Sequence, residues 1–128
     1  AAIYWPLFIP MGLMLAIFLS SLLRTDGSTP GFAFIGRIPS ELQSGLHIPM
    51  FFVLTLSLLV LLHRFEKRKC SQILFAFVLA NCVGIMNEGL QMYIPWRYAS
   101  LGDVGLNLVG TLLGFFFYFG IRKWTWVD

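Results

Sequence analysis

Charged residues are scarce in this chain. Only 12% of its 128 residues are Asp, Glu, Lys or Arg, whereas 58% are hydrophobic. This composition excludes an ordinary soluble domain, in which about a quarter of the residues are charged. It predicts an integral membrane protein. At roughly 20 residues per membrane-spanning helix, the length suits about four spans and leaves no room for a separate soluble catalytic domain.

Motifs for cofactors and catalysis are also lacking. The two cysteines, Cys70 and Cys82, fall on one predicted helix, about 18 Å apart by helical rise, which is too far for a disulfide. Neither has the spacing of a metal-binding motif. His47 and His63 lie at opposite ends of one apolar segment and cannot hold a haem together. Because HExxH, GxSxG and paired-aspartate motifs are missing too, we expect no catalytic residues, no metal and no cofactor.

Four apolar segments each predict a membrane-spanning α-helix, at residues 7–23, 46–62, 71–93 and 103–120. The predicted fold class is therefore all-α, a single domain over residues 1–128 built as a bundle of four transmembrane helices. In the first external loop, residues 32–39 (FAFIGRIP) are too few to cross a bilayer and too apolar to remain in water, so we expect an interfacial segment. Ser40 and Gln43 have capping-box spacing, which predicts a helix start at Ser40.

Positive charge is concentrated after the second span, where Arg64, Lys67, Arg68 and Lys69 occur within seven residues. Lysine and arginine are enriched in cytoplasmic loops. With four spans, this loop shares a side with both termini, and counting the loop and the tail places six positive residues there against three on the other side. The charges predict a multi-pass protein of the inner (cytoplasmic) membrane with both termini in the cytoplasm, in contact with anionic lipid and not with nucleic acid.

Polar side chains interrupt the apolar pattern between Asn87 and Gly114, on both sides of the second external turn. A carboxylate at the bilayer centre costs about 3 kcal/mol on an insertion scale, so such groups usually face protein or a wet cavity. In the predicted topology the start of span two, the end of span three and the start of span four all lie toward the outer leaflet. Six residues make up the predicted ligand-binding or structural cluster: His47, Glu88, Gln91, Arg97, Asp103 and Asn107.

Several of these residues also have an ordinary structural interpretation. Asp103 can cap the fourth helix, Asn107 can hydrogen-bond a neighbouring helix, and Arg97 can be an interfacial cation. Glu88 differs, because a carboxylate one to two turns below the surface must be protonated or must find a cation or a donor. Arg97 and His47 are the candidates, and the sequence leaves open whether His47 turns toward the cluster.

The order and spacing of these residues resemble a known family. Glu88-x-x-Gln91, Pro95-x-Arg97 and Asp103-x-x-x-Asn107-x-x-Gly110-x-x-x-Gly114 are similar to the signature of the VanZ-like membrane proteins, and His47 matches a histidine that opens an earlier helix. The resemblance covers residues 40–120. Taken alone, the GxxxG pair Gly110 and Gly114 favours close helix packing.

The resemblance implies an architecture more than a chemistry. VanZ-like proteins are associated with low-level resistance to the glycopeptide antibiotic teicoplanin, and many have no assigned activity. They often carry an Asp-Lys pair just before the histidine, where this chain has Gln43 and Ser44. Any role of that pair is therefore absent here or is supplied by other residues.

Three functions are compatible with the sequence. The first is an outer-leaflet pocket for an anionic lipid, a lipid-linked precursor or a glycopeptide, in which Arg97 binds phosphate or carboxylate while Glu88 and Asp103 accept hydrogen bonds. The second is a small accessory subunit of a larger membrane protein complex, with the cluster holding helices together. The third is hydrolysis at the lipid surface by His47 with a carboxylate, against which the missing motifs argue.

Overall fold

The chain folds into helices. The computed structural model describes residues 5–20, 28, 30–31, 33–65, 69–93 and 100–125, and the regular elements of these residues are all helical. In chain order they are α1 (Trp5–Ser20), the 3-10 helix η1 (Ala33–Arg37), α2 (Ser40–Gly45), α3 (His47–Phe65), α4 (Lys69–Gln91) and α5 (Leu101–Thr125). The all-α prediction is confirmed for this part of the chain.

Three helical stretches are long and apolar enough to cross a membrane. They are Glu41–Arg64, Cys70–Gln91 and Leu101–Ile121, while Pro6–Ser20 is apolar but shorter. The 16 residues of α1 rise about 24 Å, against roughly 30 Å of hydrocarbon in a bilayer. The first predicted span, residues 7–23, extends past α1, and residues 21–23 lie outside the described part of the chain. These helices indicate a multi-pass membrane protein.

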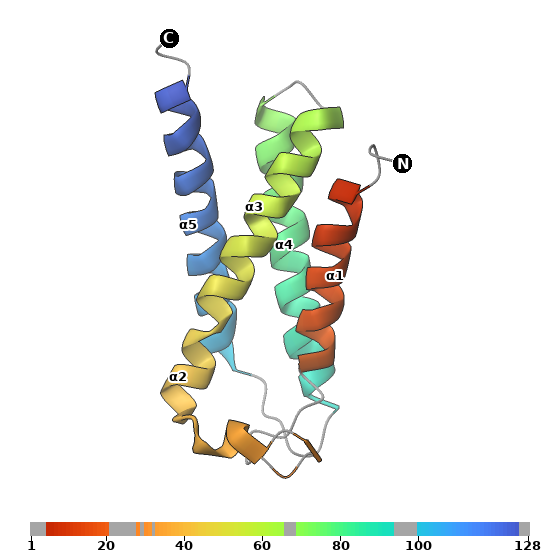
Figure 1. Cartoon of the computed structure of the whole chain (residues 1–128), viewed down its shortest axis with the longest axis vertical. Helices are drawn as coiled ribbons and strands as arrows, with labels where there is room; N and C mark the ends of the chain where they lie inside the picture. The colour runs from red at the N-terminus through yellow and green to blue at the C-terminus, as the bar shows by residue number, and fades with distance from the viewer. Residues whose placement is uncertain are drawn as a thin grey trace.

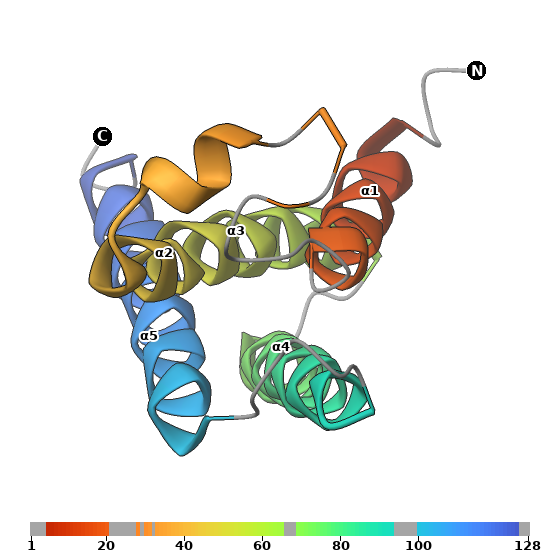
Figure 2. The same cartoon turned by 90° about the horizontal axis from the view of Figure 1, so that it is seen from below.

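The central helix is α3, which packs against α1, α4 and α5. Its contact with α5 is the most extensive in the bundle, and α1 and α5 lie on opposite sides of it (Figure 2). Successive long helices run in opposite directions, so that α1 begins and α5 ends at the end of the bundle where α3 leads into α4 (Figure 1). The opposite end therefore collects the start of α3, the end of α4 and the start of α5.

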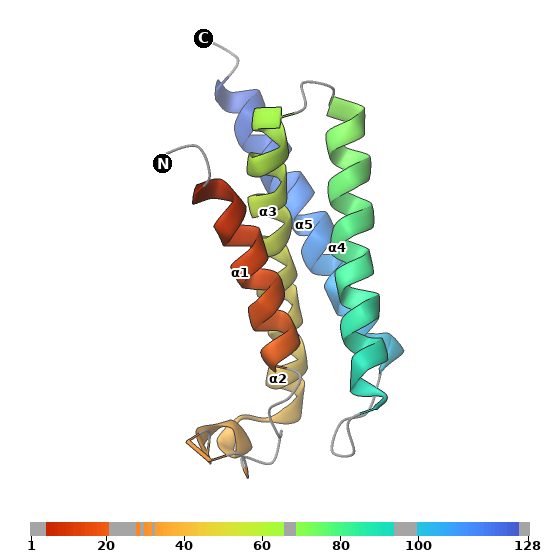
Figure 3. The ribbon, with the colours of Figure 1, turned by 90° about the vertical axis from the view of Figure 1, so that its right-hand side faces the viewer.

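The short elements η1 and α2 lie at that opposite end, and α2 leads into α3 through a turn at Leu46 (Figure 3). The Gln43 side chain fastens the two together, because its Nε2 donates to the carbonyl oxygens of Ile35 and Ile38, each at 2.9 Å. The helix start expected at Ser40 is confirmed. The N-cap position, however, belongs to Pro39, which has no side-chain capping bond.

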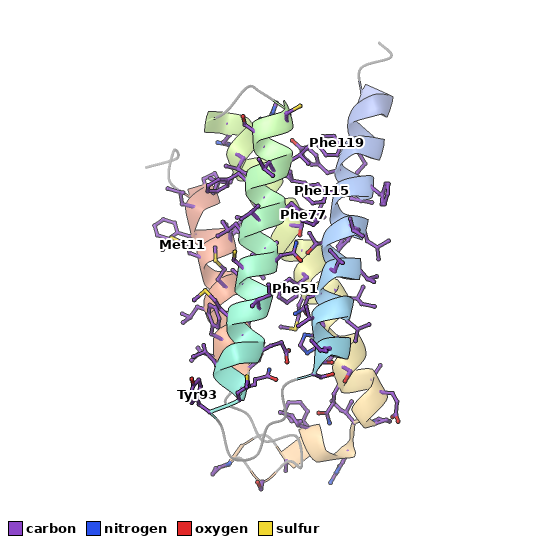
Figure 4. All side chains as sticks on the ribbon, turned by 180° about the vertical axis from the view of Figure 1, so that it is seen from behind. Met11, Phe51, Phe77, Tyr93, Phe115 and Phe119 are labelled. Atoms are coloured by element: carbon purple, nitrogen blue, oxygen red, sulfur yellow. The ribbon has the colours of Figure 1, made fainter. Side chains whose placement is uncertain are left out.

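The bundle buries an apolar core, as a soluble protein does, but it also exposes many large apolar side chains. Large apolar side chains are exposed on every long helix, and Phe8 (68%) and Phe116 (74%) are among the most exposed. Figure 4 shows Met11 pointing away from the bundle and Phe51 pointing into it. Several polar side chains are buried instead: Thr55, Gln72, Asn87, Glu88, Gln91, Asn107 and Thr111. Lipid-facing apolar surfaces and protein-facing polar groups are what a membrane requires.

Two glycines set the spacing between α3 and α5. A Cβ on Gly110 would collide with the carbonyl oxygen of Ile48, and one on Gly114 would lie 2.9 Å from Thr55 Cβ and 3.1 Å from the carbonyl oxygen of Phe52. The GxxxG pair therefore faces the backbone of α3 directly. Close approach of this kind is the usual contribution of small residues to helix packing in membranes.

Candidate functional site

Three helix ends bring a histidine and two carboxylates together. His47 is the first residue of α3, Glu88 lies three residues before the end of α4, and Asp103 is the third residue of α5. One ligand atom from each side chain lies within 4.8 Å of the other two. The three residues are far apart in the sequence, and only the antiparallel order of the helices makes them neighbours.

His47 turns into the cluster, which answers the question that the sequence left open. Its Nδ1 lies 2.8 Å from Asn107 Oδ1, and its Nε2 lies 3.9 Å from Asp103 Oδ2. Because an amide oxygen only accepts hydrogen bonds, Nδ1 donates in this bond, and Nε2 is the ring nitrogen that faces Asp103. Asn107 thus orients the ring and selects its tautomer.

Asn107 in turn depends on a glycine of α4. A Cβ on Gly84 would lie only 2.9 Å from Asn107 Nδ2. The asparagine is 2% exposed, and its Nδ2 has no hydrogen-bond partner among the described residues. The missing side chain at Gly84 therefore makes the room in which Asn107 sits between α4 and α5.

Ser100 links the two carboxylate residues, and the sequence analysis did not single it out. Its backbone N–H donates to Glu88 Oε2 at 3.1 Å, and its Oγ accepts from the N–H of Asp103 at 3.3 Å. Ser100 therefore caps α5, and the alternative in which Asp103 is the N-cap is wrong. Asp103 sits at the third helical position, which leaves its carboxylate near His47. The Ser-x-x-Asp spacing resembles a capping box, a signal in the sequence that could have identified Ser100.

Of the other two predicted members of the cluster, the structure describes Gln91 but not Arg97. Gln91 is 3% exposed at the end of α4, one turn beyond Glu88. Arg97 lies outside the described residues, so its place relative to the cluster stays a prediction. Asn81, nearly two turns before Glu88 on α4, donates from Nδ2 to the carbonyl oxygen of Phe77 in its own helix at 2.8 Å. Asn87, next to Glu88, is 2% exposed, and the sequence analysis had not counted it in the cluster.

With both carboxyl groups ionised, the cluster would carry two negative charges that need compensation. Glu88 is 5% exposed, whereas the side chains of His47 and Asp103 are 14% and 18% exposed and so remain reachable from the end of the bundle. Two carboxylates with oxygens within 4.8 Å repel each other by about 3 kcal/mol at an effective dielectric constant of about 20. A proton, a hydrogen-bond donor or a cation at this position is therefore strongly favoured.

A separate apolar groove lies away from this cluster. It has a volume of about 510 Å³ between α4 and α5 and is lined by apolar and aromatic residues that include Phe77, Phe115 and Phe119 (Figure 4). From Phe77 to Glu88 the chain rises about 16 Å along α4. The groove contains no titratable side chain, so the chemistry of the described residues lies at the His47 end of the bundle.

Comparisons of the chain with protein-family models, with curated proteins and with solved structures give no match. What the site can do must therefore follow from its own geometry. That geometry is a partly buried group of one imidazole and two carboxylates, oriented by an amide and a serine. Such a group can hold a ligand that carries donors or positive charge.

Proposed function

We propose that the chain is a VanZ-like protein of the cytoplasmic membrane, with four membrane-spanning helices and both termini in the cytoplasm. The three long apolar helices support this, as do the exposed apolar side chains of α1 and its packing against α3 and α4. The four basic residues from Arg64 to Lys69 support a cytoplasmic position for that end of the bundle. The cluster of His47, Glu88 and Asp103, at the other end, then lies in the outer leaflet.

The proposed function is binding of the head group of an anionic lipid or a lipid-linked precursor at this cluster. The observation that carries the proposal is the convergence of His47, Glu88 and Asp103 within 4.8 Å at the end of an otherwise apolar bundle. A lipid tail can lie against the exposed apolar faces of the helices while hydroxyl or amide donors of its head group reach Glu88 and Asp103, which accept hydrogen bonds. Arg97 is the proposed partner for phosphate or carboxylate.

A ligand-binding role explains the two carboxylates better than helix packing does. Side chains that only joined helices would gain nothing from two carboxylates that repel each other, because neutral amides and hydroxyls bond across helices without that cost. The 2.8 Å bond between His47 Nδ1 and Asn107 Oδ1 already joins α3 to α5 without a carboxylate. The acidic pair at Glu88 and Asp103 therefore supports a site for an external group.

Lipid binding can be tested on detergent-purified protein by native mass spectrometry with added phosphatidylglycerol, a polyprenyl phosphate or phosphatidylcholine. We expect a preference for one of the two anionic lipids, with binding at least tenfold weaker in Glu88→Gln and Arg97→Gln, because one hydrogen bond to a charged group contributes about 1.5–3 kcal/mol. Glu41→Gln and Arg37→Gln are matched controls at exposed positions. Wild-type lipid binding in folded Glu88→Gln protein would contradict the proposal.

A glycopeptide antibiotic is the other ligand that the family resemblance supports. Expression of the chain in a teicoplanin-susceptible bacterium is then expected to raise the inhibitory concentration of teicoplanin. Glu88→Gln, expressed at the same level, is expected to abolish that increase. Equal protection by both proteins would show that the cluster is not involved.

A further inference from the structure

We propose that His47, Glu88 and Asp103 bind one divalent transition-metal ion. An imidazole nitrogen and two carboxylate oxygens are the ligand types that Zn²⁺ and related ions take in proteins. They come here from three different helices and have ligand atoms within 4.8 Å of one another. The sequence has no metal-binding motif, because no two of the three ligands share a helix.

Side-chain rotation would have to bring the three ligand atoms closer together to bind an ion. Ligand atoms that lie about 2.0–2.2 Å from Zn²⁺ are roughly 3.4 Å apart in a tetrahedron. His47 Nε2 and Asp103 Oδ2 are 3.9 Å apart, and all three ligand atoms lie within 4.8 Å of one another, so the separations must shorten by about 0.5–1.4 Å. Both side chains lie in the first turn of their helices and are partly exposed, which gives an ion a path from the end of the bundle.

The surroundings orient the ligands as the second shell of a metal site does. Metal-binding histidines almost always donate their other ring N–H to an oxygen, which fixes the ring and its tautomer. His47 does this through the 2.8 Å bond from Nδ1 to Asn107 Oδ1, which directs Nε2 toward the carboxylates. Glu88 is likewise held, because its Oε2 accepts from the backbone N–H of Ser100 at 3.1 Å.

The charge of the three ligands also matches that of a divalent ion. Two carboxylates and a neutral imidazole carry a charge of −2, which one divalent ion neutralises. Three protein ligands leave at least one coordination position open. An oxygen of a phosphate or carboxylate head group can occupy that position, and the ion removes the repulsion that the two carboxylates would otherwise exert on it. This role of the ion in lipid binding rests on the proposed function, whereas metal binding itself does not.

The metal site can be tested with Zn²⁺ as the probe and Mg²⁺ as the comparison. Protein purified in mild detergent through a histidine-free tag is stripped with a chelator and titrated by calorimetry, and bound zinc is counted by elemental mass spectrometry. We expect one Zn²⁺ per chain, much tighter than Mg²⁺, because imidazole is a poor ligand for magnesium. Binding is expected to weaken at least tenfold in His47→Gln and Asp103→Asn and to be unchanged in the controls His63→Gln and Glu41→Gln.

A variant that gains a spectroscopic signal tests the site even if other variants lose zinc binding because they misfold. His47→Cys replaces the imidazole by a thiolate ligand, so Co²⁺ added to this variant is expected to give a thiolate-to-cobalt charge-transfer band that Co²⁺ with the wild-type protein does not give. The wild-type chain already contains Cys70 and Cys82, so it controls for binding at those thiols. Circular dichroism of each variant reports whether the helices are retained.

Two results would overturn the metal site. One is the absence of stoichiometric Zn²⁺ binding by the wild-type protein, and the other is unchanged Zn²⁺ affinity in both His47→Gln and Asp103→Asn. The lipid assay separates the two proposals. Zinc binding without any dependence of lipid binding on Glu88 removes the proposed function alone, and Glu88-dependent lipid binding without zinc binding removes the metal site alone.

Discussion

Substitution of Gly110 tests the helix packing on which the candidate site depends. In Gly110→Ala the new Cβ would collide with the carbonyl oxygen of Ile48 and would lie 3.1 Å from Phe51 Cβ, so α5 must move away from α3. Gly105 lies on the same helix with nothing within 4 Å of its would-be Cβ. The two alanine variants therefore share their helix chemistry and differ only in what the added methyl group meets.

The magnitude follows from two opposing effects. Alanine in place of glycine within a helix is worth about 1 kcal/mol in helix propensity, and this gain is common to both variants. Overpacking a well-packed interior costs about 1–3 kcal/mol, and contact with a backbone oxygen belongs at the upper end because the backbone of α3 cannot rotate away. We expect Gly110→Ala to be about 1–3 kcal/mol less stable than Gly105→Ala.

The difference can be measured by equilibrium unfolding in mixed micelles with an increasing fraction of sodium dodecyl sulfate, followed by circular dichroism. The same proteins can be titrated with Zn²⁺, since a shift of α5 carries Asp103 and Asn107 away from His47. Gly110→Ala should then lose zinc affinity as well as stability. Equal stability of the two variants would refute the close packing of α5 on α3.

Three further predictions concern the site and the orientation of the chain. Gly84→Ala should weaken Zn²⁺ binding about 10–100-fold, because its Cβ would lie 2.9 Å from Asn107 Nδ2 and displace the group that orients the histidine. Ser100→Ala should lower the free energy of unfolding by about 1 kcal/mol through loss of the α5 cap. A membrane-impermeant maleimide should label Cys70 only from the cytoplasmic side, and Cys82, about 18 Å deeper on α4, only after solubilisation.

Gly84→Ala and Ser100→Ala each have a matched control variant. Gly89→Ala adds a methyl group to α4 with nothing within 4 Å, and Ser71→Ala removes an exposed hydroxyl. Equal zinc affinity in the two glycine variants would contradict the role of Gly84. Equal stability of the two serine variants would contradict capping by Ser100, and labelling of Cys82 in intact vesicles would place that part of α4 in water.

The helices themselves could be predicted from hydrophobicity alone. Residues 46–62, 71–93 and 103–120 correspond to α3 (His47–Phe65), α4 (Lys69–Gln91) and α5 (Leu101–Thr125). The ends differ by two or three residues at most positions and by five at the end of α5. α5 extends past its apolar run because the backbone hydrogen bonds of a helix continue through the polar residues that follow, whereas α4 ends two residues before its predicted end.

The starts of the helices were harder to predict, because capping is decided by one residue. Asp103 stands at the start of the apolar run, yet the helix begins two residues earlier, and Ser100 supplies the cap. At Ser40 the spacing to Gln43 was right for a capping box, but Pro39 occupies the cap position and Gln43 donates to the carbonyl oxygens of Ile35 and Ile38 instead. At both helix starts, several side chains within one turn were able to cap the free backbone N–H groups.

The site could be predicted as a set of residues but not as a geometry. Polarity within an apolar stretch indicates that a side chain faces protein, which places Glu88 and Asn107 in the interior without saying what they meet. His47, Glu88 and Asp103 come together only because the first turn of α3, the last turns of α4 and the first turn of α5 lie at fixed distances from one another. Those distances depend on glycines whose effect is steric, so no spacing of ligands along the chain could reveal them.

The same glycines determine both the packing of the bundle and the geometry of the site. Gly110 brings α5 close to α3, and Gly84 makes room for Asn107 between α4 and α5. A larger residue at either position separates helices that carry ligands, so it should reduce stability and zinc affinity together. A ligand substitution such as Asp103→Asn should instead reduce zinc affinity with little loss of stability, because it relieves repulsion between carboxylates. If the glycine variants lose both stability and zinc affinity while Asp103→Asn loses only zinc affinity, the cluster is a binding site. If Asp103→Asn also loses stability, the cluster serves to join the helices.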